Sequence, residues 1–151
     1  MTAATIHASA VLVGARAVLI RGASGAGKSR LALALLAAPA SGRLSFARLI
    51  GDDRICVEAA HGRLLVRPAP ALAGLIEIRG IGIRTVAFER VGAVGLVVDL
   101  AIHAPRLPTG DESRAEIAGV WLPRLAVADG VDPLPVVLAR IAADEGGQAG
   151  L

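Results

Sequence analysis

The apolar positions of the chain fall into short runs that end at glycine, proline or charged residues. Residues 17–20 and 94–100 are almost wholly apolar, a pattern typical of strands that are buried on both faces of a sheet. Residues 48–50 predict a further short strand, which ends at a glycine and two aspartates. Residues 55–58 and 63–67 flank a turn that contains His-Gly, and they predict a β-hairpin. Together these patterns favour a mixed sheet.

Helical signals occur at two places. Residues 30–38 consist mainly of leucine and alanine, which are strong helix formers, and Pro39 ends the run. A second helix is expected over residues 133–143, whereas residues 145–151, with three glycines, are expected to form a disordered tail. The elements predict an α/β fold with a mixed sheet and flanking helices, in which residues 1–144 form one domain.

Composition narrows the possible functions. No apolar run approaches the roughly 18 residues of a membrane span, and the N-terminus has no secretory pattern, so neither a membrane nor secretion is expected. Cys56 is the only cysteine, which excludes an internal disulfide and fits a reducing cytoplasm. The net charge is +3, but the basic residues are scattered singly without aromatic neighbours. This argues against a nucleic-acid partner and weakly favours an acidic or phosphorylated one.

A glycine-rich loop joins the first predicted strand to the first predicted helix. Gly22, Gly27, Lys28 and Ser29 match the pattern G-x-x-x-x-G-K-S, and Lys28 is the only lysine among 16 basic residues. Glycines let backbone N–H groups turn toward phosphates, and the helix start directs its positive dipole end at them. The loop predicts binding of ATP with Mg²⁺: Lys28 reaches the phosphates and Ser29 ligates the metal. The residues expected to bind ATP are Gly22, Ala23, Ser24, Gly25, Ala26, Gly27, Lys28 and Ser29.

The second metal ligand and the catalytic base have two candidate positions. Asp52 and Asp53 follow a strand, and adjacent acids suit metal coordination by one and proton abstraction by the other. The alternative for this pair is an ordinary acidic turn. Asp99 follows the apolar residues 94–98, as the Mg²⁺-binding aspartate does in many phosphate-loop proteins. The residue pattern alone leaves this choice open.

Further polar candidates lie in residues 75–79, which are expected to be extended. Alternation puts Glu77 and Arg79 on one face of this strand. They predict either a solvated edge with an ion pair, or a metal-binding carboxylate beside a phosphate-binding arginine. No metal-ligand spacing joins Cys56 to the three histidines, which are His7, His61 and His103.

Four segments occur in a distinctive order: residues 6–7, the loop at 22–29, Gly-Asp-Asp-Arg at 51–54 and Glu-Ile-Arg-Gly-Ile-Gly at 77–82. They resemble the catalytic domain of HPr kinase/phosphorylase, a bacterial enzyme that phosphorylates a serine of the phosphocarrier protein HPr. The likeness runs from about His7 to Arg106, with weaker agreement to Pro123. The resemblance implies a fold related to the phosphoenolpyruvate carboxykinase type of phosphate-loop protein, and a hexameric assembly.

The resemblance also implies roles for individual residues. Lys28 would grip the phosphates of ATP, and Ser29 and Glu77 would bind Mg²⁺. The residue pattern of the acidic pair, rather than the resemblance, makes Asp52 a further expected metal ligand. Arg79 would lie beside these residues in the same motif.

The resemblance places the acid–base chemistry on Asp53. This residue matches the second acid of the family's pair, which accepts the proton of the HPr serine and returns it in the reverse reaction. His7 matches an active-site histidine, and Arg106 matches a catalytic arginine after the central strand. Asp99 falls where the family does not require an acid, so the resemblance favours Asp52 and Asp53.

The resemblance leaves several alternatives open. The chain is expected to be a short proteobacterial form without the family's N-terminal domain. The C-terminal segment that the family links to removal of the phosphate has no clear match, so phosphorylase activity is left open. Two other functions compete with a kinase of HPr or an HPr-like protein. One is a small-molecule kinase or plain NTPase, and the other is an ATP-binding sensor that regulates a partner without phosphate transfer.

Overall fold

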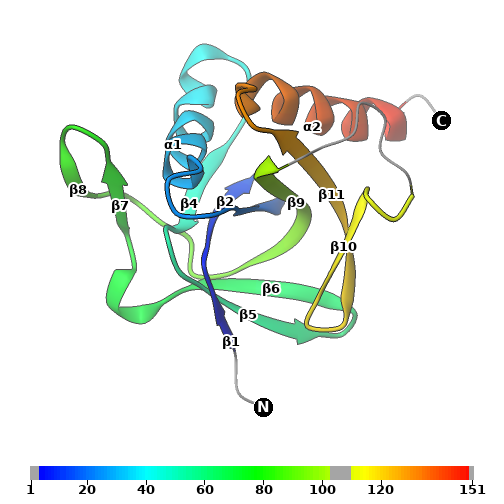
Figure 1. Cartoon of the computed structure of the whole chain (residues 1–151), viewed down its shortest axis with the longest axis horizontal. Coiled ribbons are helices and arrows are strands. Elements are labelled where there is room, and N and C mark those ends of the chain that lie inside the picture. Colours follow the sequence, from blue (N-terminus) through cyan, green and yellow to red (C-terminus); the bar gives the residue numbers. More distant parts are fainter. Residues whose placement is uncertain (1–3, 103–109, 150–151) are drawn as a thin grey trace.

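The computed structural model describes residues 4–102 and 110–149. In this part of the chain a curled mixed sheet carries two α-helices on one side, and a small two-stranded sheet projects beside them (Figure 1). The elements are β1 (Ala4–Ile6), β2 (Ala8–Val13), β3 (Arg16–Arg21), α1 (Lys28–Ala37), the 3-10 helix η1 (Ala38–Ser41), β4 (Ala47–Gly51), β5 (Ile55–Ala60), β6 (Arg63–Pro68), the 3-10 helix η2 (Pro70–Leu72), β7 (Leu75–Ile78), β8 (Gly82–Thr85), β9 (Gly92–Ile102), β10 (Arg114–Ile117), β11 (Val120–Ala128) and α2 (Pro133–Ala149).

Strand β9 is the centre of the main sheet, whose order is β1-β5-β6-β9-β3-β2-β4. It pairs in parallel with β3 along one side. On its other side it pairs antiparallel with β6 at Gly92 and Ala93, and in parallel with β11 from Val97 onward. β9 therefore joins the hairpin half of the sheet to the half that carries the helices.

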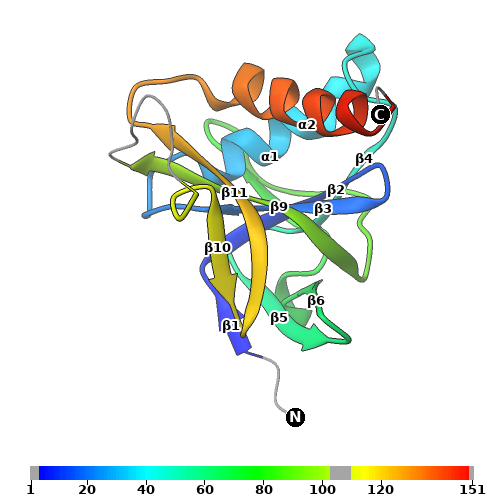
Figure 2. The same cartoon turned by 90° about the vertical axis from the view of Figure 1, so that its right-hand side faces the viewer.

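Both faces of the central strands are buried, as their apolar sequences predict. On the helix side, Ile20 and Val98 pack in one cluster with Leu31 and Leu35 of α1. On the opposite face, Leu19 and Val97 belong to a second cluster, which is enclosed by the hairpin strands and β10. Figure 2 shows this division, with α1 and α2 above the sheet and β5, β6 and β10 below.

The predicted strand, loop, helix and hairpin are confirmed, and so is the mixed sheet with flanking helices. Strands β1, β2, β8, β10 and β11 were not predicted. β2 has the sequence ASAVLV, and alanine has weak β-propensity, so its conformation is fixed by pairing with β3 and β4 rather than by local preference.

The last helix differs from the prediction, because α2 continues to Ala149 instead of ending at Ala143. Residues 145–149 thus lie within α2, and residues 150 and 151 lie outside the described residues. Glycines weaken a helix but do not remove the backbone N–H group, so the hydrogen bonds can continue through them. Within the described ranges, no helix is long and apolar enough to cross a membrane.

Candidate phosphate-binding and catalytic site

The glycine-rich loop lies between the end of β3 and the start of α1, at the carboxyl end of the central parallel strands. Gly25 and Gly27 have φ angles of 85° and 103°, a left-handed conformation that favours glycine, and a side chain at either position would point into open space. Gly27 is the N-cap of α1, and no side chain caps this end. The first turn of α1 therefore keeps N–H donors and a positive dipole end that favour an anion.

Lys28 folds back over this loop. Its side chain is largely buried, with 7% of the residue exposed. Its Nζ donates to the carbonyl oxygens of Gly22 at 2.9 Å and Ala23 at 3.2 Å. These bonds satisfy the buried ammonium and hold it against the backbone that the loop would present to phosphates.

Asp52 is the buried centre of a hydrogen-bond network that reaches the loop. The Ser29 hydroxyl donates to both carboxylate oxygens, at 2.7 and 2.8 Å. The fully buried Ser9 donates to Oδ1 at 2.6 Å, and the backbone N–H of Glu77 donates to Oδ2 at 3.2 Å. Three segments that are distant in the sequence thus meet at one carboxylate. Ser9 was not predicted, and its one sequence signal is a single hydroxyl within an otherwise apolar stretch.

The side chain of Asp53 is exposed, in contrast to the buried side chain of Asp52. The Asp53 side chain is 62% exposed, and its carboxylate lies 3.6 Å from Nδ1 of His7, which is 60% exposed. Its φ of 69°, together with a hydrogen bond of 2.8 Å from the N–H of Arg54 to the carbonyl of Asp52, makes a classic γ-turn, which is rare and strained. The turn lets two adjacent aspartates face opposite environments, one inward and one outward.

Gly51 explains how the chain enters this turn. A Cβ at this position would lie 2.7 Å from Cδ1 of Ile55 and 3.3 Å from Cα of Pro68. The backbone of β4 therefore approaches the β5–β6 hairpin too closely for a side chain, and this approach brings Asp52 beneath the loop.

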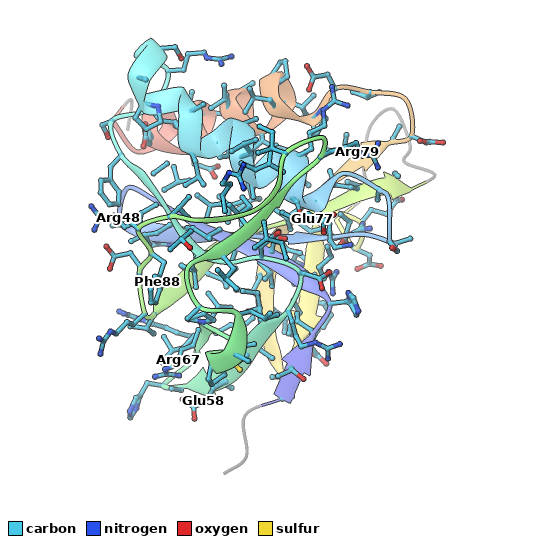
Figure 3. All side chains as sticks on the ribbon, turned by 90° about the vertical axis from the view of Figure 1, so that its left-hand side faces the viewer. Arg48, Glu58, Arg67, Glu77, Arg79 and Phe88 are labelled. Atoms are coloured by element: carbon cyan, nitrogen blue, oxygen red, sulfur yellow. The ribbon has the colours of Figure 1, made fainter. Side chains whose placement is uncertain are left out.

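Glu77 and Arg79, which are labelled in Figure 3, lie on the β7–β8 hairpin. Glu77 is exposed at the side chain, while its backbone bonds to Asp52. Arg79 lies in the turn that follows β7, and it is exposed. The hairpin is thus tied to the site through its backbone, and within the described residues Glu77 and Arg79 form no ion pair with each other.

Asp99 has a different environment from Asp52. Arg21 donates to both of its oxygens, from Nε at 2.8 Å and from Nη2 at 2.9 Å, and Nε of Arg124 donates to Oδ2. Burial raises the pKa of this carboxyl, but the hydrogen bonds and charges of the two arginines lower it by more, so the pKa lies below its usual value of 3.8. The oxygens of Asp99 are bonded to the two arginines, whereas those of Asp52 are bonded to Ser29. Asp52, and not Asp99, is thus the carboxylate that lies at Ser29.

Two further candidates, Arg106 and His103, lie outside the described residues. Within the described ranges, no group of three or more His, Cys, Asp or Glu side chains comes together as a cation site. The Ser29 hydroxyl and the Asp52 carboxylate bring oxygen ligands together at the start of α1. Oxygen donors of this kind suit Mg²⁺, which usually keeps water and substrate oxygens among its ligands.

A strand, a G-x-x-x-x-G-K-S loop and a helix in direct succession form the arrangement that is typical of phosphate-loop proteins. The family model described as HPr Serine kinase C-terminal domain matches residues 1–94, and the chain belongs to this family.

Curated relatives agree with this family. A protein named HPr kinase/phosphorylase from Limosilactobacillus reuteri (strain DSM 20016) is 37% identical over 135 residues, which cover 82% of this chain and 40% of the relative. One of the same name from Mycoplasma mycoides is 43% identical over 77 residues, covering 51% of this chain and 22% of the relative. The chain thus spans well under half the length of these relatives.

A solved structure shows the same fold. It is titled as the Hpr(Ser) kinase/phosphatase from Coxiella burnetii, and it superposes with a TM-score of 0.74 at 23% sequence identity. The match covers 97% of this chain and 93% of the other.

Proposed function

We propose that the chain is an ATP-dependent protein-serine kinase that phosphorylates HPr or an HPr-like phosphocarrier of a phosphotransferase system. The observation that carries this proposal is the pair Asp52 and Asp53. One carboxylate is hydrogen-bonded to Ser29 at the start of α1, and the carboxylate of the adjacent residue is exposed beside His7. A buried acid for the metal and an accessible acid for the incoming hydroxyl are what phosphoryl transfer to an alcohol requires.

ATP would be held by the loop from Gly22 to Ser29. The left-handed glycines, the uncapped helix start and the buried ammonium of Lys28 fit a row of phosphates. Mg²⁺ would be held by Ser29 and Asp52, with Glu77 on the neighbouring hairpin as a further ligand. When bound, the ion neutralises phosphate charge.

Asp53 would act on the acceptor serine. Its carboxylate accepts the hydroxyl proton while the serine oxygen bonds to the γ-phosphorus and the bond to the ADP oxygen breaks. His7, at 3.6 Å, would orient this carboxylate. Arg106, by the family resemblance, and Arg79, as the arginine that follows the metal-binding candidate Glu77, would add positive charge around the transferred group. In the reverse reaction Asp53 would return the proton to the serine oxygen, a step that phosphorylase activity would need. The curated relatives are named HPr kinase/phosphorylase.

Further properties of the proposed enzyme follow from the family. A kinase of a phosphotransferase system would act in the cytoplasm, where the lone Cys56 stays reduced. It would form a homo-oligomer, a hexamer by resemblance, and its fold would be related to the phosphoenolpyruvate carboxykinase type.

The test is direct. The protein is incubated with ATP, Mg²⁺ and an HPr-family protein from the same organism, and intact-mass and peptide mass spectrometry then detect phosphoserine. One phosphoserine that disappears in the Asp53→Asn variant supports the kinase. ATP binding without phosphoserine on HPr would favour the sensor, and transfer to a small molecule would favour the other enzyme.

A further inference from the structure

Asp99, Arg21 and Arg124 form an ion cluster at the end of the central strands, which we call the Asp99 cluster. Arg21 is the last residue of β3, Asp99 lies opposite it on β9, and Arg124 comes from β11 on the other side of β9. Asp99 is 7% exposed, and both of its oxygens accept hydrogen bonds from Arg21. Arg124 also donates to the carbonyl of Glu112 at 2.9 Å. The proposed catalysis uses none of these three side chains.

The cluster leads directly into the glycine-rich loop. Arg21 precedes Gly22, and the carbonyl oxygen of Gly22 accepts the hydrogen bond from Nζ of Lys28. Gly22 also packs against β9, because a Cβ at this position would lie 3.3 Å from Cβ of Leu100, the neighbour of Asp99. Strand β9 thus holds the start of the loop at two successive residues, by an ion pair at Arg21 and by close contact at Gly22.

We propose that Arg21 and Asp99 are positioning residues for the phosphate loop. Their bidentate ion pair fixes the loop entry, so that the Gly22 carbonyl and hence the Lys28 ammonium are in place before the nucleotide arrives. A loop with several glycines loses much conformational freedom when it orders, and a fixed entry lowers this cost. The inference rests on the proposed function only in that the loop binds a nucleoside triphosphate.

A substitution of Arg124 distinguishes this proposal from a purely structural role of the Asp99 cluster. Arg124 binds the same carboxylate, but it connects β9 to β11 and to the backbone of Glu112, and unlike Arg21 it does not adjoin the loop in the sequence. A cluster that only stabilises the sheet would make Arg21→Gln and Arg124→Gln affect nucleotide binding alike. Asp99→Asn is a poor test, because it leaves two arginines without their shared carboxylate and the variant can fail to fold.

The experiment measures the affinity for ATP with Mg²⁺ by calorimetry, at a temperature where all variants are folded, and the thermal midpoint of each. Arg21→Gln and Arg124→Gln are compared with wild type and with Glu58→Gln. The control residue Glu58 pairs with Arg67 at 3.2 Å on the β5–β6 hairpin, far from Glu77 and Arg79 in Figure 3. We expect both cluster variants to have a lower thermal midpoint than the wild type. Only Arg21→Gln is expected to bind ATP about tenfold more weakly. Arg21→Lys, which keeps the charge but loses the fork, should fall in between.

Three outcomes would overturn the inference: wild-type affinity in Arg21→Gln, equal losses of affinity in both cluster variants, or a wild-type protein that does not bind ATP. The binding experiment contains no acceptor protein, so its result does not depend on whether the proposed kinase activity exists. A selective loss in Arg21→Gln stands even when no phosphoserine forms on HPr.

Discussion

The hydroxyl of Ser9 donates a hydrogen bond of 2.6 Å to the carboxylate of Asp52, in a fully buried contact between residues that are 43 positions apart. The same Ser9 oxygen accepts the N–H of Asp53 at 3.2 Å. One buried hydroxyl therefore fixes both the inward-facing acid and the backbone of the outward-facing acid.

Replacing Ser9 with alanine should destabilise the protein. The change removes one donor from the buried Asp52 carboxylate and one acceptor from the Asp53 N–H, at a cost of about 1–3 kcal/mol in the free energy of unfolding. Urea denaturation measures this cost. Ser41→Ala is a matched control, because the exposed Ser41 hydroxyl donates to a carbonyl of the same short helix and accepts only from the exposed side chain of Arg43. Equal stabilities of the two variants would contradict the prediction.

Lys28→Ala should lower the affinity for ATP by about 100-fold, because the ammonium is the loop's one charged donor to the phosphates. Lys28→Arg should not restore binding, since a planar guanidinium fork differs in shape from the compact ammonium that donates to the two loop carbonyls. Arg30→Ala, at an exposed position on the same helix, is the control and should bind ATP as the wild type does. Full kinase activity in Lys28→Ala would disprove the role of the loop.

Asp53→Asn should separate binding from transfer. The exposed carboxylate has no hydrogen bond to the loop, so affinity for ATP should stay within about threefold of wild type. Transfer to the HPr serine should slow by about 100- to 10,000-fold, because the proton acceptor is lost. Single-turnover phosphorylation and ATP calorimetry on the same preparation measure the two quantities. Unchanged transfer would assign the base to another residue.

The Asp99 cluster should lose its stabilising effect in acid. The pKa of Asp99 is lower in the folded protein than its ordinary value of 3.8, so its contribution to stability is fully present above that value. The contribution decreases below it, and it is lost as the pH falls through the folded pKa. The stability deficit of Arg124→Gln should therefore be largest near neutral pH and shrink below about pH 4.

Denaturation of this variant and wild type across that range provides the test. Arg140→Gln is the control, because its partner Asp144 is half exposed and such surface pairs contribute little at any pH. A deficit in Arg124→Gln that stays constant through acid would contradict the assignment.

The loop could be predicted because its chemistry is local: Gly22 to Ser29 are contiguous, and their spacing alone predicts a strand, a turn and a helix start. The different burial of the Asp52 and Asp53 side chains could not be predicted in this way. It depends on Ser9 from an alanine-rich strand, and on a γ-turn that a non-glycine residue adopts only under tertiary constraint.

Asp99 was ambiguous for a similar reason. Its two arginines lie 78 and 25 positions away, so the sequence showed an acid at a strand end but not its partners. Pairing between distant residues is decided by strand register, and register emerges only when β3, β9 and β11 are assembled.

Strand β9 pairs with β3, β6 and β11, and this has a consequence for the order in which parts of the protein unfold. The amides of Val97 and Val98 lie in a strand with partners on both sides, where β3 and β11 flank it, so no edge strand can leave and expose them alone. Their exchange with deuterium should require global unfolding and should be among the slowest in the chain. The phosphate loop is thus attached to the strands that are expected to unfold last. Partial unfolding at the β1–β5 or β7–β8 edges can occur while the loop keeps its shape.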